Sequence, residues 1–218
     1  MKKICICGGG SLGHVIAGYL SANGKATVSI LTNHPTAWQN KIEICVPDNG
    51  EMLIGNIACV SANPAEALLD AEIVLLCLPG FLIKDELIKI RDFINSGTYV
   101  GSVFSSTGFF FEALKLLNED IPLWGFQRVP FISRIKEYGH SASLLGYKGC
   151  YHIAVERDTD ANKELFRYWV ENSFDRPVTL LKNYLEASLT NSNPLLHTAR
   201  LYSCLLYTSP SPRDSTSS

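Results

Sequence analysis

Three glycines near the start of the chain restrict its fold more than any other stretch does. Residues 3–7 form a short apolar run of the kind that makes a buried strand, and this run stops at Gly8 in "CGGGSLG". From Ser11 to Asn23 the apolar residues recur at helical spacing and share one face. The chain therefore begins with a strand, a glycine turn and a helix, which is the first unit of a fold that alternates strands with helices.

The spacing of these glycines, Gly8-x-Gly10-x-x-Gly13, is typical of a turn that lies against a dinucleotide. Gly8 allows a tight turn, Gly10 lets the backbone approach a pyrophosphate, and Gly13 lets the helix pack closely on the strand. The helix that opens at Ser11 offers free N–H groups and a partial positive charge to phosphates. The alternative is a glycine-rich turn that binds nothing, but the strand and helix around the motif favour binding.

Strands and helices continue to alternate as far as residue 118. Asn63 is placed to cap a short helix that Pro64 opens, and Asp48-Asn49-Gly50 marks a tight turn between two strands. The other expected elements are strands at 26–31, 72–79 and 98–104 and helices at 81–94 and 108–118. This order predicts the α/β class, with a Rossmann-type, doubly wound and mostly parallel sheet covered on both faces.

The pattern changes after Pro122. Residues 122–131 and 134–156 read as strands joined by glycine turns, 159–174 as a helix capped by Thr159 or Asp160, and 177–181 as a last short strand. One new helix is expected after Lys182. We therefore expect a dinucleotide-binding domain at 1–181, the start of a helical substrate and catalytic domain at 182–203, and a disordered tail at 204–218.

Charge and composition argue against several classes of partner. The 19 basic and 21 acidic residues give a net charge of −2 without long runs, which argues against nucleic acid and anionic membranes. The first apolar run is shorter than the about 7–15 residues of a signal peptide, and no run approaches the about 18 residues of a membrane span. The seven cysteines include no CxxC pair, which favours reduced core residues over a metal site. We expect a cytoplasmic protein with a small-molecule partner and no metal; an oligomer is compatible with the sequence.

The residues after the second strand bear on which dinucleotide is bound. An acid at this point would hold the ribose 2′-hydroxyl of NAD, but the chain reads "LTNHPTAW". Thr32, Asn33 and His34 can hydrogen-bond a 2′-phosphate, with Lys41 as a cationic helper, or they can form an ordinary loop. The cofactor predicted here is NAD(P), with NADP favoured over NAD.

Several longer stretches point to one family. They are "CICGGGSLGHVIAG", "IVLLCLPGF", "SSTGFFFEAL", "FQRVPFISRIKEYG" with "LLGYK", and "NSNPLLHTARLY". Together they resemble the opine dehydrogenases, the octopine and nopaline dehydrogenase family, over nearly the whole chain to residue 203. Many dehydrogenases share the glycine turn, whereas the series from "PF" to "LGYK" and the Asn-Pro-x-x-His stretch are more particular.

The resemblance implies a reaction and a catalytic residue. Members of this family condense an amino acid with a 2-oxo acid to an imine, which NAD(P)H reduces, in a cleft between a Rossmann domain and a helical domain. The family's catalytic histidine matches His197, whose imidazole side chain suits proton transfer; otherwise His197 is an ordinary helix-surface residue. Arg200, one turn further on, either binds a substrate carboxylate or simply contacts solvent.

Other candidates lie at strand ends. Pro79 and Gly80 are expected to line the nicotinamide pocket, and Ser105, Ser106 and Thr107 are expected in the same crevice, with Ser106 a candidate substrate contact. The alternative for all five is ordinary turn chemistry.

Three further positions are more ambiguous. Gln127, another candidate substrate contact, stands where the family often carries Glu, which leaves an acid role there in doubt. Arg134 and Lys136 with Glu137 fit a structural ion-pair edge better than a substrate site. His14 can donate a hydrogen bond to the cofactor or be an ordinary helix residue.

Two rival functions remain open. A reductase similar to ketopantoate reductase or glycerol-phosphate dehydrogenase would share the glycine turn but would need a catalytic Lys in the second domain, and residues 181–203 contain only Lys182. A non-catalytic module that senses dinucleotides would need no second domain.

The last residues have an unusual composition. The stretch "CLLYTSPSPRD", from Cys204 to Asp214, resembles a translated adapter of transposase-based sequencing libraries; the alternative is a genuine Ser/Pro-rich tail. We therefore expect a truncated opine dehydrogenase that binds cofactor but is inactive, with Leu185, Leu189, Leu195, Leu196 and Leu201 forming an exposed apolar face.

Overall fold

The computed structural model describes the backbone of residues 1–207, and the side chains of that range apart from 192–195 and 204–207. The strands are β1 (Lys2–Cys7), β2 (Ala26–Leu31), β3 (Lys41–Val46), β4 (Glu51–Ser61), β5 (Ile73–Leu76), β6 (Tyr99–Ser102), β7 (Leu123–Phe126), β8 (Phe131–Glu137), β9 (Ser141–Tyr147), β10 (Tyr151–Glu156) and β11 (Val178–Leu180). The α-helices are α1 (Ser11–Ala22), α2 (Pro64–Ala67), α3 (Gly80–Ile90), α4 (Phe109–Leu116), α5 (Asp160–Phe174), α6 (Tyr184–Leu189) and α7 (Ser192–Tyr207). Short 3-10 helices are η1 (Pro35–Ala37), η2 (Arg91–Phe93) and η3 (Ser105–Thr107).

Within residues 1–207 the strands form one eleven-stranded sheet, in the order β11-β10-β7-β6-β5-β1-β2-β4-β3-β9-β8. The central strands β2, β1, β5, β6 and β7 run parallel to one another. The chain leaves β1 toward β2 on one side and returns to β5 on the other, so the order reverses beside β1. This confirms the predicted α/β class with a doubly wound, mostly parallel sheet, in which ligands bind at the reversal.

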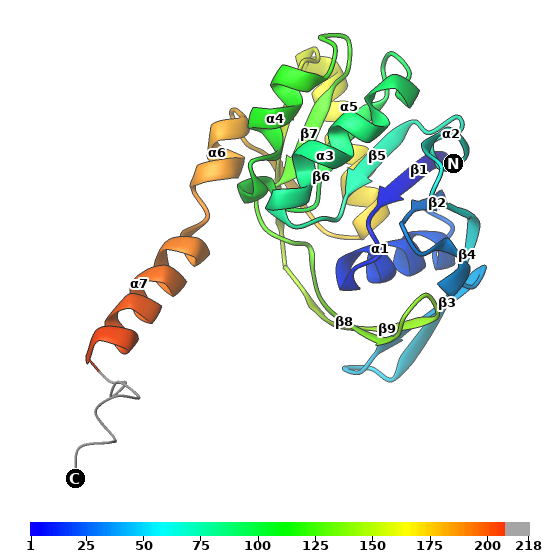
Figure 1. Ribbon diagram of the computed structural model, residues 1–218, viewed down its shortest axis with the longest axis horizontal. Coiled ribbons are helices and arrows are strands. Elements are labelled where there is room, and N and C mark those ends of the chain that lie inside the picture. Colours follow the sequence, from blue (N-terminus) through cyan, green and yellow to red (C-terminus); the bar gives the residue numbers. More distant parts are fainter. Residues whose placement is uncertain (208–218) are drawn as a thin grey trace.

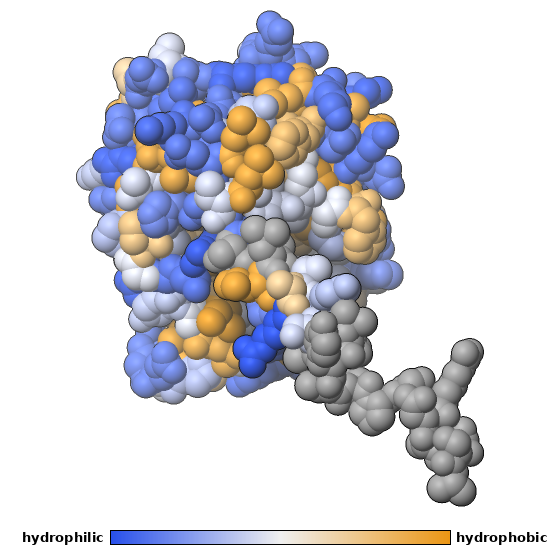
Figure 2. Space-filling view, turned by 90° about the vertical axis from the view of Figure 1, so that its left-hand side faces the viewer, coloured by the Kyte–Doolittle hydropathy of each residue, from blue (hydrophilic) through white to orange (hydrophobic). Residues whose placement is uncertain are grey.

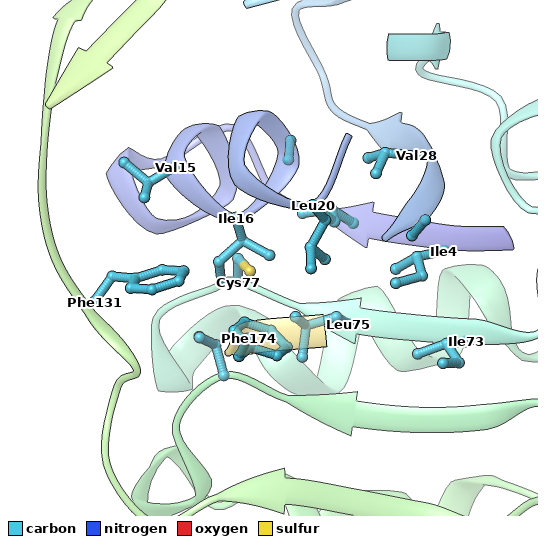
Figure 3. Packing of buried hydrophobic residues seen from close by; sticks show 14 of the residues in the cluster. Ile4, Val15, Ile16, Leu20, Val28, Ile73, Leu75, Cys77, Phe131 and Phe174 are labelled. Carbon is cyan, nitrogen blue, oxygen red and sulfur yellow. The ribbon is translucent and has the colours of Figure 1, made fainter. Parts of the chain in front are cut away.

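The side chains of β1 point alternately into two hydrophobic cores, one on each face of the sheet. Ile4 and Ile6 belong to the cluster that contains residues of α1 and α5, whereas Cys5 and Cys7 belong to the cluster with residues of α2, α3, α4 and α6. Successive side chains of a strand point to opposite faces, so both faces of the central sheet are buried, as its apolar strands predict. Figure 3 shows the first core, with α1 packed over the strands and Phe131 of β8 beside it.

Helix α1 is enclosed because the sheet curves around it. The hairpins β3–β4 and β8–β9 pass beneath α1 in Figure 1, and the parallel pairing of β3 with β9 joins them through Glu43 and Ser141. A side chain at Gly18 would overlap Ile44 of β3, so glycine allows this close approach. The N-terminal helix of the site is therefore held from two sides.

Side-chain caps start two of the helices where the sequence predicts. Asn63 Oδ1 accepts a hydrogen bond from Ala65 N at 3.1 Å, and Pro64 opens α2. Thr159 Oγ1 accepts one from Asn162 N at 3.3 Å, which makes Thr159 rather than Asp160 the cap of α5. Both caps satisfy helix N–H groups that would otherwise lack partners.

The region after Lys182 differs from the single helix expected there. Helix α6 ends at Leu189 and α7 begins at Ser192, because α6 buries Ala187 against the sheet body while α7 extends away from it (Figure 1). Residues 204–207 continue α7, which differs from the disorder expected there, and 208–218 lie outside the described residues.

Exposed apolar side chains occur on both C-terminal helices. Figure 2 shows hydrophobic surface on the face from which α7 extends. Leu185, Leu189, Leu196 and Leu201 are exposed, as predicted, whereas the side chain of Leu195 lies outside the described set.

In the part of the chain that the structure describes, none of the helices is both long and apolar enough to cross a membrane. Cys5, Cys7 and Cys77 are buried, unpaired core residues, and Cys45, Cys59 and Cys150 are also unpaired.

Candidate functional site

The glycine turn between β1 and α1 lies at the carboxyl edge of the sheet. Gly8 has φ +116°, a conformation that favours glycine, and a Cβ there would lie 2.7 Å from the Cys77 carbonyl oxygen. A Cβ at Gly13 would overlap the Gly8 carbonyl oxygen, whereas one at Gly10 would meet no protein atom within 4 Å. Close packing within the protein thus requires glycine at positions 8 and 13, whereas the backbone of Gly10 faces open space.

A cavity of about 740 Å³ lies directly above this turn. Gly10 is the N-cap of α1, and the first turn of that helix carries no acidic residue, so its N–H groups are available to an anion. Residues from four segments at the carboxyl edge line the cavity: Gly10, Ser11, Leu12, Cys77, Leu78, Pro79, Gly80, Val103, Phe104, Ser106, Thr107, Val129, Phe131, Ile132, Ser133 and Arg134. The cavity therefore extends from the glycine turn to the ends of β5 and β6.

Ser106 contributes a polar group to this cavity that the protein leaves unpaired. Its Oγ is buried and has no hydrogen-bond partner among the described residues. The same is true of Ser105 Oγ, which packs against Gly125 and does not line the cavity. A buried hydroxyl without a partner costs free energy unless a ligand satisfies it. Ser106 is therefore suited to contact a ligand, whereas Ser105 is a packing residue.

A second, smaller pocket of about 160 Å³ lies at the ends of β1 and β2. Thr32 is buried and Asn33 and His34 are exposed; all three line it together with Gly8. Tyr138, from the turn of the β8–β9 hairpin, also lines it, with its hydroxyl 3.4 Å from Thr32 Oγ1. The sequence indicated the Thr32 group but not Tyr138, which reaches the site only through the curvature of the sheet.

The same pocket contains two charged residues of α3. Glu86 and Lys89 line it, with Glu86 Oε1 4.0 Å from Lys89 Nζ. Burial raises the pKa of Glu86, and Lys89 partly offsets this. Their spacing on an amphipathic helix gave no sign of a site.

His14 is a buried residue that links the glycine turn to the hairpin. Its Nε2 accepts a hydrogen bond from Gly139 N at 2.7 Å, and its Nδ1–H donates to Gly10 O at 2.9 Å. Its ring lies 4.1 Å from that of Trp38, centroid to centroid. Burial lowers its pKa, opposed by the Gly10 hydrogen bond. Both ring nitrogens bond to the protein's own backbone, so His14 is a structural residue with no nitrogen left for a cofactor.

Three candidate residues lie outside the large cavity. His197 and Arg200 are exposed on α7. Gln127 Nε2 donates to Thr190 Oγ1 at 2.6 Å, which ties the end of β7 to the residue after α6. The catalytic role of His197 and the substrate roles of Arg200 and Gln127 stay predictions.

The ion-pair edge expected on β8 does not form. Glu137 Oε2 lies at hydrogen-bond distance, 3.0 Å, from His140 Nδ1, and among the described residues no ion pair joins Glu137 to Arg134 or Lys136. Arg134 instead lines the large cavity and donates to Ser133 O at 3.0 Å. The tight turn at Gly139 brings His140 back to Glu137, which explains this difference. Within the described residues, no group of three or more His, Cys, Asp or Glu is placed to hold a metal.

The doubly wound sheet, the glycine turn beside its reversal and the cavity above that turn define a Rossmann-type domain, the class that binds dinucleotides. The chain is 22% identical over 214 residues to an octopine dehydrogenase of Mizuhopecten yessoensis and 27% identical over 177 residues to a tauropine dehydrogenase of Arabella iricolor, which covers 92% and 75% of the chain. Both relatives are named as dehydrogenases that form opines, so the chain is similar in sequence to members of the opine dehydrogenase family.

Solved structures agree on the fold. An octopine dehydrogenase in complex with NADH and agmatine superposes with a TM-score of 0.82 at 19% identity, over 96% of this chain and 56% of that one. A 2-dehydropantoate 2-reductase from Porphyromonas gingivalis gives a TM-score of 0.71 at 14% identity, over 96% of this chain and 73% of that one. No family model matches the chain. The chain spans about half the length of the curated relatives named above, 54% and 45%.

Proposed function

We propose that this chain is the cofactor-binding part of a nicotinamide-dinucleotide-dependent opine dehydrogenase. The observation that carries the proposal is the open space at Gly10, which lines a cavity of about 740 Å³. Gly10 also begins α1, and no side chain caps the N–H groups of that helix. A pyrophosphate needs a close backbone approach and free N–H groups, and this turn supplies both. The relatives' names and the NADH in the solved octopine dehydrogenase support the same cofactor class.

The two pockets divide the binding of this cofactor between them. Gly10 and Ser11 would hold the pyrophosphate, and Thr32 and Asn33 would hold the adenosine half. Pro79 would lie against the nicotinamide. When bound, a reduced nicotinamide supplies hydride to the substrate carbon.

The substrates proposed for the whole protein are an amino acid and a 2-oxo acid. Solved octopine dehydrogenases contain L-arginine or pyruvate beside NADH, which supports these two classes. In this proposal, His197 moves the proton that accompanies reduction, Arg200 binds a carboxylate, and Ser106 and Gln127 orient substrate. The unpaired Ser106 hydroxyl in the cavity supports its role.

The preference between NADP and NAD is a finer question. Thr32, Asn33 and His34 line the adenosine pocket and are the groups on which the preference for NADP rests. Lys41 is not among the lining residues, but Lys89 adds a cation there. Glu86 adds a carboxylate beside the expected 2′ position, which argues for NAD.

Substitution of Gly10 tests dinucleotide binding directly. The Gly10→Ala chain should fold normally, because its Cβ meets no protein atom, but should bind NADH at least tenfold more weakly, because the methyl group occupies the space of the pyrophosphate. Gly149→Ala is the matched control, since Gly149 also faces open space and lies in neither pocket. Binding is measured by quenching of tryptophan fluorescence, and equal affinity of Gly10→Ala and the unaltered chain would refute the proposal.

A ketopantoate-reductase-like activity is the second candidate, favoured by the superposition on the Porphyromonas gingivalis enzyme. NAD(P)H oxidation on mixing an amino acid with pyruvate supports the opine reaction, whereas oxidation with ketopantoate alone supports this reductase. Because the given chain alone is expected to bind without turnover, this assay needs the whole protein, and binding without turnover of either substrate there is the result expected for a dinucleotide-sensing module.

A further inference from the structure

Glu86 is a partly buried carboxylate that accepts no hydrogen bond from the described residues. Its side chain is 17% exposed, and its charged neighbour is Lys89, at 4.0 Å. Burial, partly offset by Lys89, raises the pKa of Glu86. An acid held in this way is expected to have a further partner, because burial of a carboxylate is costly unless donors satisfy its oxygens.

The carboxylate lies beside the ends of the two strands that hold the adenosine pocket. Glu86 lines the pocket with Leu31 and Thr32 at the end of β2 and with Gly8 at the end of β1. A hydrogen bond with Cys5 and burial raise the pKa of the Cys7 thiol, and the negative charge of Glu86 raises it further. This interaction is consistent with a carboxylate near the last residue of β1.

In dinucleotide-binding folds of this class, an acid at the end of the second strand accepts hydrogen bonds from the ribose hydroxyls of NAD. Here that strand ends at Leu31, and neither Leu31 nor the next residue, Thr32, is acidic. We propose that Glu86, supplied from α3, takes this place: it accepts hydrogen bonds from the adenosine ribose and disfavours a 2′-phosphate, so that the chain prefers NAD to NADP. This inference rests on the dinucleotide binding proposed above and reverses the preference drawn from the sequence.

The other groups facing the pocket do not remove this preference. Lys89 is 33% exposed and at 4.0 Å from Glu86 forms a long ion pair, which leaves the carboxylate oxygens free to accept short hydrogen bonds. Thr32 Oγ1 is 3.4 Å from the Tyr138 hydroxyl, so it is already partly engaged. A 2′-phosphate would bring about two negative charges beside Glu86, whereas ribose hydroxyls bring donors.

The experiment compares NADH and NADPH binding to the 218-residue chain by tryptophan fluorescence. The unaltered chain should bind NADH at least about tenfold more tightly than NADPH. Glu86→Gln should lose about tenfold in NADH affinity, because a charged acceptor is lost, and should gain in NADPH affinity, because a repulsion is removed. Asp85→Asn is the matched control: it removes the same charge from the exposed neighbouring position, outside the pocket, and should leave the ratio unchanged.

The outcomes separate this inference from the proposed function. If both dinucleotides bind but the ratio is the same in Glu86→Gln, or both affinities fall equally, the inference is wrong while dinucleotide binding stands. If neither binds, both proposals fail. Should Glu86→Gln not fold, the unaltered chain still decides: it should bind adenosine 5′-monophosphate more tightly than adenosine 2′,5′-bisphosphate, and the opposite order overturns the inference.

Discussion

His14 on α1 accepts a hydrogen bond from the backbone N–H of Gly139, 2.7 Å away in the turn of the β8–β9 hairpin. The other ring nitrogen donates to Gly10 O, so the imidazole joins the glycine turn to a segment far away in the sequence. With one nitrogen donating and the other accepting, the ring is required in its neutral form. His14 therefore contributes directly to the position of the glycine turn relative to the β8–β9 hairpin.

Replacement of His14 should weaken the fold. His14→Phe removes both hydrogen bonds and leaves the Gly139 N–H without its partner, so we expect the free energy of unfolding to fall by about 2–4 kcal/mol. Urea denaturation measures this. His152→Gln, at an exposed position of β10, is the control and should change stability by less than about 0.5 kcal/mol. An equal loss in both variants would contradict the role given to His14.

Stability should also depend on pH through this histidine. Burial lowers the pKa of His14 below its ordinary value of 6.5, opposed by the Gly10 hydrogen bond, so the unfolded chain binds a proton more readily than the folded one. Its contribution is therefore complete above pH 6.5 and is lost as the pH falls below 6.5 toward the folded pKa. Urea denaturation between pH 7.5 and 5 should show this loss in the unaltered chain and a smaller one in His14→Phe. Parallel curves would count against it.

Gly13 should tolerate no side chain. In Gly13→Ala the new Cβ would overlap the Gly8 carbonyl oxygen, so α1 must move away from β1, at a cost of about 1–3 kcal/mol in unfolding free energy and with loss of NADH binding. Gly149→Ala, which faces open space, should leave both quantities unchanged. Thermal denaturation followed by circular dichroism gives the comparison, and a Gly13→Ala chain as stable as the control would contradict the close contact.

Ser105 and Ser106 can be compared directly, because the hydroxyl of each is buried without a hydrogen-bond partner among the described residues. Ser106→Ala and Ser105→Ala each remove a buried hydroxyl that has no partner among the described residues, so each should leave stability unchanged or raise it by up to about 1 kcal/mol. Only Ser106 lines the large cavity, so only its substitution should weaken ligand binding, by about fivefold to tenfold. Titration with NADH, alone and with pyruvate, measures this. Equal effects on binding from both substitutions would place the ligand elsewhere.

Much of the fold follows from local sequence patterns. The strands of the parallel centre are short and rich in apolar residues, and Asn63 and Thr159 mark their helices through capping, so these elements were predictable. The glycine turn likewise predicted its own strand and helix. The break between α6 and α7 was not predictable, because it depends on the burial of Ala187 against the sheet body.

The sequence predicted only those residues of the candidate site that directly follow a strand. Pro79, Ser106 and Thr32 follow strands, and the carboxyl-end rule brings them to the two pockets. Tyr138 reaches the small pocket because β3 pairs with β9, a contact between distant segments that no local pattern encodes. Glu86 was missed because a Glu on an amphipathic helix normally faces solvent.

The curvature of the sheet around α1 also has a consequence for the order of folding. The hydrogen bond between His14 and Gly139 joins residues 125 positions apart in the sequence. The glycine turn at residues 8–10 therefore cannot be held in this way until the chain has been synthesised past the β8–β9 hairpin. Contacts of such long separation form slowly, since the intervening loop must first be closed. The pockets at the glycine turn should therefore be among the last parts of the protein to mature, and the nascent chain should acquire dinucleotide affinity only after the hairpin closes over α1.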